Sequence, residues 1–277
     1  MYNNIPSSNY RVITRNNAFR YLSRNTCIPD YVCGIATEAF RGKSVIHTVN
    51  FPDSLHRIGA RAFLGCNSLQ EVSLPDHVTQ IGPGAFSKCD SLQQANIPKS
   101  LADLPQGLFQ ESRKLHTIHF HPNNQIHTIR KNTFGECKSL TSLVLPDSIT
   151  EINDRAFYRC RSLDSIYFPT GLKQIGSQAF YSCNFSSLEL PDSLEVLEES
   201  AFFKCNRLEY VRLPQSVRYI GKWVFHGCNR LKVLEIRHDP EFIGDWIINK
   251  SAVIRCYRGS KVDQYCQEAG FQTEYLD

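Results

Sequence analysis

Residues 74–92 read LPDHVTQIGPGAFSKCDSL, and residues 213–231 read LPQSVRYIGKWVFHGCNRL. Both stretches place Leu, Pro, Val, Ile, Gly, Phe, Cys and Leu at the same spacings. The Phe of this pattern recurs in steps of 23 residues, apart from one step of 25 and one of 22. Its nine positions are Phe40, Phe63, Phe86, Phe109, Phe134, Phe157, Phe180, Phe202 and Phe225. A period of this length indicates stacked structural repeats.

Each part of the repeat has a physical reading. The segment before the Pro, such as residues 143–145, alternates as a short half-buried strand does. The Pro cannot donate a ladder hydrogen bond, so it ends the strand. On the opposite side of the unit, we expect Phe to fill the core and the preceding Ala to permit close approach. One unit cannot bury its apolar face alone, so the units stack, with parallel strands roughly 4.8 Å apart.

A glycine follows the second apolar pair of several repeats, for example Gly59 and Gly82. Pro105 occupies the same slot in another repeat, and proline fixes φ near −65°. We therefore expect the glycine to be needed for space or ease of turning, and not for a left-handed backbone.

Seven of the eleven cysteines share one slot in the repeat: Cys66, Cys89, Cys137, Cys160, Cys183, Cys205 and Cys228. We expect a column of small buried thiols that help to satisfy backbone carbonyls. Disulfides between adjacent repeats are the alternative. Zinc binding is less favoured, because no Cys-x-x-Cys pair exists. Cys27 with Cys33, and Cys256 with Cys266, lie outside the column and are disulfide candidates if the protein is exported.

The pattern Leu-Pro-x-x-Val-x-x-Ile-Gly-x-x-Ala-Phe-x-x-Cys-x-x-Leu resembles the BspA-like class of leucine-rich repeats. The resemblance covers about residues 10–277, and residues 259–271 are similar to the element that often ends such arrays. It implies a repeat solenoid: a right-handed superhelix with a parallel concave β-sheet, short convex strands or 3-10 segments, and a C-terminal cap with a short helix. We expect a flexible N-terminus (1–9), a repeat array (10–240) and the cap (241–277).

Two columns of outward-facing strand residues should cross the concave sheet. In the N-terminal half these residues are small and polar, whereas Tyr and Arg, which are enriched at binding hot spots, gather in the C-terminal half. The expected partner-binding residues are Tyr167, Tyr210, Arg212, Glu189, His119 and Val144. The alternative is an ordinary solvated sheet face that carries β-favouring aromatics.

The repeat over residues 104–129 departs most from the pattern. It has Leu108 in place of Ala and Ser112 in place of Cys, and it carries four of the nine histidines. Two of them, His119 and His121, lie two residues apart on an expected strand and so share a face. A metal site or a pH switch is one interpretation. Solvated histidines beside a loop insertion are the favoured one.

No catalytic motif is recognisable in the sequence: there is no Gly-x-Ser-x-Gly, phosphate-binding loop, dinucleotide fingerprint or His-Glu-x-x-His. The formal charge of +4 over 277 residues argues against nucleic-acid binding. No apolar run is long enough to span a membrane. We therefore expect a non-enzymatic, monomeric module that binds another protein and needs no cofactor or metal.

Two other functions stay open. The first is a cell-surface or secreted adhesin that binds host proteins or other cells, as the resemblance implies. The second is a glycan-binding or enzymatic module. The polar start of the chain lacks a basic segment followed by an apolar one, so no signal peptide is indicated. The sequence as written therefore suggests a cytoplasmic protein, with a surface or secreted location as the family-based alternative.

Overall fold

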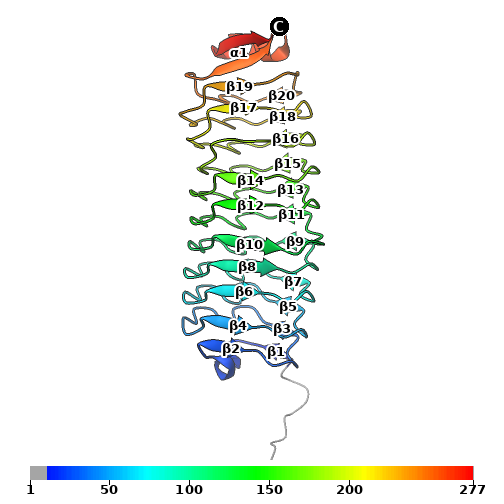
Figure 1. Cartoon of the computed structure of the whole chain (residues 1–277), viewed down its shortest axis with the longest axis vertical. Coiled ribbons are helices and arrows are strands. Elements are labelled where there is room, and N and C mark those ends of the chain that lie inside the picture. The colour runs from blue at the N-terminus through cyan, green and yellow to red at the C-terminus, as the bar shows by residue number, and fades with distance from the viewer. Residues whose placement is uncertain (1–10, 277) are drawn as a thin grey trace, which may run out of the picture.

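Each repeat forms one rung of a parallel β-solenoid, and the rungs stack along the long axis of the molecule (Figure 1). The computed structural model describes residues 11–276. The expected flexible N-terminus, residues 1–9, lies outside the described residues. Every strand pair is parallel, as Thr117 opposite Gln94 illustrates, so the expected parallel repeat solenoid is confirmed.

The longer strands lie on one side of the solenoid, called here the long-strand face (Figure 1). They are β2 (Asn25–Cys27), β4 (Thr48–Asn50), β6 (Glu71–Ser73), β8 (Gln94–Ile97), β10 (Thr117–Phe120), β12 (Ser142–Val144), β14 (Ser165–Tyr167), β17 (Tyr210–Arg212), β19 (Val233–Glu235), β21 (Val253–Tyr257) and β22 (Gln272–Leu276). In five of them, β2, β4, β6, β12 and β17, the middle residue is buried and its neighbours are exposed, which is the expected alternation.

Two-residue strands form the short-strand face. They are β1 (Val12–Ile13), β3 (Gly34–Ile35), β5 (Arg57–Ile58), β7 (Gln80–Ile81), β9 (Asp103–Leu104), β11 (Thr128–Ile129), β13 (Glu151–Ile152), β15 (Gln174–Ile175), β16 (Val196–Leu197), β18 (Tyr219–Ile220) and β20 (Phe242–Ile243). From β9 to β20 they make one continuous seven-stranded sheet. The C-terminal half of the array is therefore held in register on this side.

Tandem turns around the Ala-Phe pair close each rung. In the rung of Phe157, the residue before Ala156 and the residue before Cys160 both have a left-handed backbone, with φ of 54° at Arg155 and 56° at Arg159. Such angles are uncommon for residues other than glycine. The backbone N–H groups of Arg155, Phe157 and Arg159 each donate to a carbonyl of the next rung at 2.8–2.9 Å. These bonds offset the strain, and the described part of the chain has a 3-10 segment only at η1 (Ala18–Tyr21).

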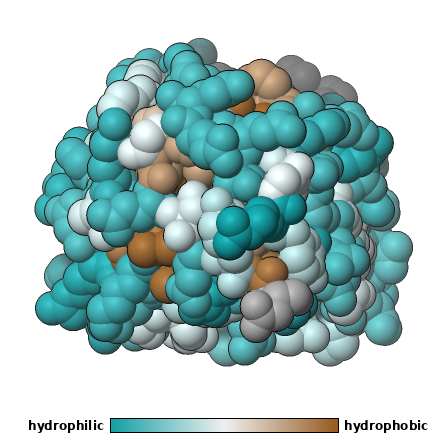
Figure 2. Space-filling model, turned by 90° about the horizontal axis from the view of Figure 1, so that it is seen from above, coloured by the Kyte–Doolittle hydropathy of each residue, from teal (hydrophilic) through white to brown (hydrophobic). Residues whose placement is uncertain are grey.

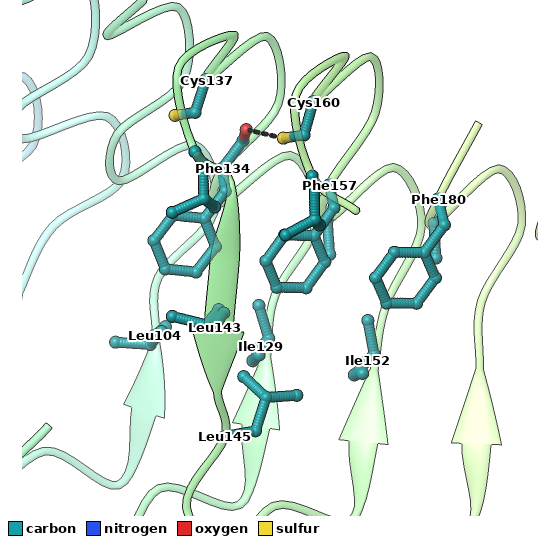
Figure 3. Close-up of a cluster of buried hydrophobic side chains, with 14 of the residues drawn as sticks. Leu104, Ile129, Phe134, Cys137, Leu143, Leu145, Ile152, Phe157, Cys160 and Phe180 are labelled. Carbon is teal, nitrogen blue, oxygen red and sulfur yellow. Dashed lines mark hydrogen bonds between the residues drawn. The ribbon is translucent and has the colours of Figure 1, made fainter. Parts of the chain in front are cut away.

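The nine phenylalanines stack into one buried column inside the solenoid. Figure 3 shows three of them, Phe134, Phe157 and Phe180. The ring centroids of neighbouring phenylalanines lie 5.0–5.4 Å apart in most rungs. The separation widens to 6.1 Å and 5.8 Å on either side of Phe109, where Leu108 and Thr133 replace Ala. The small residue before Phe therefore allows the close approach of neighbouring rungs.

Lack of space beside the preceding rung explains the glycine that follows the second apolar pair. Gly82 does not have a left-handed backbone, and a Cβ added there would lie 2.3 Å from the backbone nitrogen of Ala60 in the preceding rung. The left-handed residues are elsewhere, at the two positions that flank Ala-Phe. Glycine occupies these positions in some rungs, as at Gly84 and Gly227, but charged residues occupy many of the others, so the repeat pattern marks them only weakly.

The seven repeat cysteines form a column beside the phenylalanines. In all seven, the thiol donates to the backbone carbonyl of the Phe one rung earlier, at 3.1–3.3 Å. Figure 3 shows this bond from Cys160 to Phe134. Ser112 makes the same bond to Phe86 at 2.9 Å. All eleven cysteines are free thiols, so the structure contains none of the alternative disulfides.

The C-terminal end begins as another rung and then changes character. Strands β20 and β21 extend the two faces, and helix α1 (Lys261–Ala269) and β22 follow. The helix starts at Ser260, whose side chain accepts from Asp263 N–H, and stops at the left-handed Gly270. Seen from above, this end is largely hydrophilic with small apolar patches (Figure 2). Within residues 11–276, no helix has the length and apolar character needed to cross a membrane.

Candidate functional site

The long-strand face carries the six residues expected to bind a partner. Val144, Tyr167 and Tyr210 follow or precede buried strand residues and are 70%, 57% and 46% exposed. His119 at the end of β10 and Glu189 in the rung after β14 are exposed as well. All of these side chains, and that of Arg212, line hollows on this face. The structure thus brings them onto one surface, spread over several rungs.

Two large hollows flank Tyr167. The His119 hollow has a volume of about 950 Å³, and it lies between the segments 116–125 and 142–148 with Tyr167 at its border. The Glu189 hollow has a volume of about 900 Å³, and it lies between the segments 186–192 and 209–216. A smaller hollow of about 340 Å³ between Tyr167 and Glu189 links the two regions. Tyr167 therefore stands between two depressions of the surface.

Irregular repeat lengths explain where these hollows lie. The 25-residue step adds two residues around Pro122, and strands β10 and β12 are not paired there. The 22-residue step removes one residue between Cys183 and Pro191, and residues 186–190 form no strand. Phe185 is drawn into the core in that rung, against Phe180. Pairing also lapses between β4 and β6, where the repeat length is regular.

Strand β19 contains a buried acid at the C-terminal end of this face. By strand alternation Glu235 belongs to the outward column, but its side chain is only 2% exposed. Arg237 donates to Glu235 at 2.6 Å, Arg255 at 3.2 Å and the Tyr210 hydroxyl at 3.0 Å. Arg212 lies 3.6 Å from the same carboxylate. Cross-strand neighbours therefore cover a position that the strand pattern alone assigns to solvent.

Two pKa shifts follow from this arrangement. Burial by itself raises the pKa of Glu235, but the hydrogen bonds from Arg237, Tyr210 and Arg255 outweigh it, and the pKa is lowered. Burial and the hydrogen bond to Glu235 raise the pKa of Tyr210. The Tyr210 hydroxyl and Arg212 are thus engaged within the protein. What they offer a partner is the exposed ring and the outer edge of the guanidinium.

The histidines of the irregular repeat do not converge on one point. His116 is hydrogen-bonded to Thr117 at 2.8 Å, and His121 accepts from the backbone of Asn123 at 3.1 Å. His121 also lies 4.0 Å from Asp76. Over residues 11–276, no three His, Cys, Asp or Glu side chains are close enough together to hold a metal ion. The metal interpretation therefore has no ligand set in this part of the chain.

The sequence analysis did not predict a row of stacked aromatic rings on the side of the solenoid formed by the turns around Ala-Phe. Rings stack from Tyr158 to Tyr181 at 5.0 Å, on to Phe203 at 5.2 Å and to His226 at 5.7 Å. Arg159 and Lys204 lie over two of these rings. The sequence did contain a signal. The residue after the repeat Phe is not aromatic in the first five rungs and is aromatic in the last four.

One comparison with a solved structure agrees with the fold. A leucine-rich repeat protein from Bacteroides ovatus has 24% identity and a TM-score of 0.69, covering 86% of this chain and 64% of that one. The chain therefore spans less than two thirds of that protein. A leucine rich cell surface protein from Faecalibacterium prausnitzii has 20% identity and a TM-score of 0.43, covering 92% and 88%. A leucine rich repeat protein from T. pallidum has 24% identity and a TM-score of 0.44, covering 91% and 86%.

The comparison with curated proteins finds no match. The family described as BspA type leucine rich repeat region matches residues 13–128 and 127–254, in six copies. This match spans most of the sequence and rests on the same repeat that forms the rungs. The chain therefore belongs to the BspA type leucine-rich repeat family.

Proposed function

We propose that this chain is a non-enzymatic module that binds another protein through the long-strand face, with Tyr167 at the centre of the site. The observation that carries the proposal is the position of Tyr167, an exposed ring between two hollows. Aromatic side chains that can be enclosed by a partner are typical interface anchors. Polar residues around them form the rim that most interfaces have.

The surroundings of Tyr167 support binding over chemistry. Val144 adds apolar area on one side, and Glu189 adds a carboxylate on the other. The pKa shifts of Glu235 and Tyr210 arise from burial and from hydrogen bonds within one ion-pair network, and the pKa of Glu209 is lowered by its hydrogen bond from Lys232. A site of this kind offers shape, apolar area and charge to a partner.

Replacement of the two exposed tyrosines tests the proposal. Protein fragments displayed from the source genome are first selected on the wild-type chain, and the affinity of each is then measured for Tyr167→Ala and Tyr210→Ala. Loss of a hot-spot side chain costs about 2 kcal/mol or more, which is roughly a thirtyfold loss of affinity. Tyr219→Ala, on the short-strand face, is the matched control.

Thermal melts must show that each variant stays folded, because Tyr210 also contacts Glu235. The proposal predicts weaker binding for Tyr167→Ala and unchanged binding for Tyr219→Ala. Selected fragments that bind the wild type and Tyr167→Ala equally well would overturn it.

A further inference from the structure

The rung of residues 184–191 has a break on the long-strand face. In several rungs the residue before the Pro, or at the equivalent position, donates its backbone N–H to the next rung, as Leu145 does to Tyr167 at 3.2 Å and Leu213 to Glu235 at 2.9 Å. The corresponding N–H groups of Phe168 and Leu190 make no such bond within the described chain. The break is confined to this face, because β15, β16 and β18 remain paired on the other.

Residues 186–190 consequently have free main-chain groups. Among residues 11–276, no backbone hydrogen bond joins this segment to β14 on one side or to β17 on the other. The segment is exposed or half-exposed and lines the Glu189 hollow. Backbone N–H and C=O groups require partners, and at an accessible surface these are water or a ligand. An extended polypeptide satisfies such groups when it pairs with an open strand.

The charged side chains at this break that have no ion-pair partner among the described residues are both carboxylates. Glu189 and Asp192 line both the Glu189 hollow and the smaller hollow beside Tyr167. Neither carboxylate forms an ion pair within the described residues, whereas Glu209 nearby is paired with Lys232 at 2.8 Å. Arg212, a cation on the same wall, lies against Glu235. A partner that enters the hollow therefore meets two uncompensated carboxylates.

We propose that the break at residues 186–190 binds an extended polypeptide segment rich in Lys or Arg. Its main chain pairs with the free backbone groups of this segment, and its cationic side chains contact Glu189 and Asp192. The inference rests on the proposed function and specifies the partner's chemistry. Polyanions such as nucleic acid are disfavoured, because like charges would face each other across the contact.

A synthetic peptide tests both parts of this inference. The probe is a fluorescently labelled ten-residue peptide of alternating Lys and Thr, followed by fluorescence anisotropy with the full chain. We expect binding that weakens at least tenfold in the double variant Glu189→Gln/Asp192→Asn. Asp53→Asn is the matched control, because Asp53 follows a strand Pro in an N-terminal rung just as Asp192 does. We expect that control to bind the peptide as the wild type does.

Two further measurements separate main-chain pairing from charge. The same peptide with N-methylated backbone nitrogens keeps its charge and should bind at least fivefold more weakly. A serine inserted between Asn184 and Phe185 restores the 23-residue spacing of the neighbouring rungs. That variant should form the missing strand and melt at the same temperature as the wild type or higher. It should also lose its affinity for the peptide.

The inference fails if an alternating Glu and Thr peptide binds equally well, if the carboxylate variants keep full affinity, or if N-methylation has no effect. Binding of a neutral oligosaccharide at this break in place of the peptide would also overturn it. Fragments that depend on Tyr167 but not on Glu189 and Asp192 would refute this inference and leave the proposed function standing. Fragments that do not depend on Tyr167 would refute the proposed function.

Discussion

At the scale of single residues, the cysteine slot shows what the repeat requires of a side chain. The slot takes a small buried donor that reaches the Phe carbonyl of the preceding rung, and Ser112 serves as well as cysteine. Burial raises the pKa of the Cys66 thiol to about 12, and that of Cys160 is raised too. Such thiols stay protonated at neutral pH, which suits a structural donor and not a nucleophile or metal ligand.

Substitution of Cys160 tests this reading. Cys160→Ser keeps a donor for the Phe134 carbonyl, whereas Cys160→Ala removes it and leaves that carbonyl with only the turn bond from Cys137 N–H. The alanine variant should be less stable than the serine variant by about 0.5–1.5 kcal/mol, the net contribution of one hydrogen bond. Urea unfolding of both variants gives the difference. Equal stabilities would show that the slot selects only for size.

At the scale of elements, strands β17, β19 and β21 are linked by side-chain ion pairs as well as by backbone hydrogen bonds. Their parallel register brings Arg212, Glu235 and Arg255 into one row across three rungs. Glu235 in the middle is covered by its neighbours and accepts hydrogen bonds from three of them. The row stabilises the C-terminal end of the long-strand face only while Glu235 is ionised.

The stability of this row should depend on pH. The pKa of Glu235 is lowered in the folded chain, so its ionised form stabilises the fold above the unfolded value of about 4.3. That contribution is lost as the pH falls through the lower folded value. The wild type should therefore be more stable than Glu235→Gln at pH 7, and the difference should shrink below about pH 4.

Urea unfolding at several pH values measures this difference. Glu189→Gln is the control, because Glu189 is exposed and has no ion pair among the described residues, and it should match the wild type throughout. A gap between wild type and Glu235→Gln that stays constant into acid would contradict the assigned role of the carboxylate.

At the scale of the whole molecule, the solenoid is a stack in which each rung covers its neighbour. The column of Phe rings continues through nine rungs, and the last of them, Phe225, bonds through its backbone to Ile247 of the following segment. Each end of such a stack must be closed by a unit with a polar outer face. We propose that residues 241–277 close the C-terminal end, where Tyr265 of α1 bonds to Gly244 at 3.1 Å.

Deletion of residues 241–277 should therefore expose the apolar side of the Phe225 rung. We expect the truncated chain to aggregate or to form oligomers, whereas the full chain should run as a monomer. Size-exclusion chromatography with light scattering checks both states. A soluble, monomeric truncation would show that the cap assignment is wrong.

Much of this architecture was predictable from the sequence, because identical apolar positions repeat at one spacing. A unit with Phe, Cys, Leu and Ile at fixed positions can bury them only by stacking on copies of itself, so parallel strands and a continuous core follow. The exposed positions of Tyr167 and Tyr210 follow from strand alternation. These are properties of a single repeat, which local sequence describes fully.

The tertiary structure alone decided what depends on neighbouring rungs. The repeat is one residue shorter near Phe185, and residues 186–190 form no strand on the long-strand face. The strands of the short-strand face remain paired in the same rung. Glu235 is buried because Tyr210, 25 residues before it, and Arg255, 20 residues after it, both contact its carboxylate. Sequence determined the repeat and its core, since burial acts on each unit in the same way. The hollows, the break and the charge row arise from small differences between adjacent units, and these take effect only when the units are stacked.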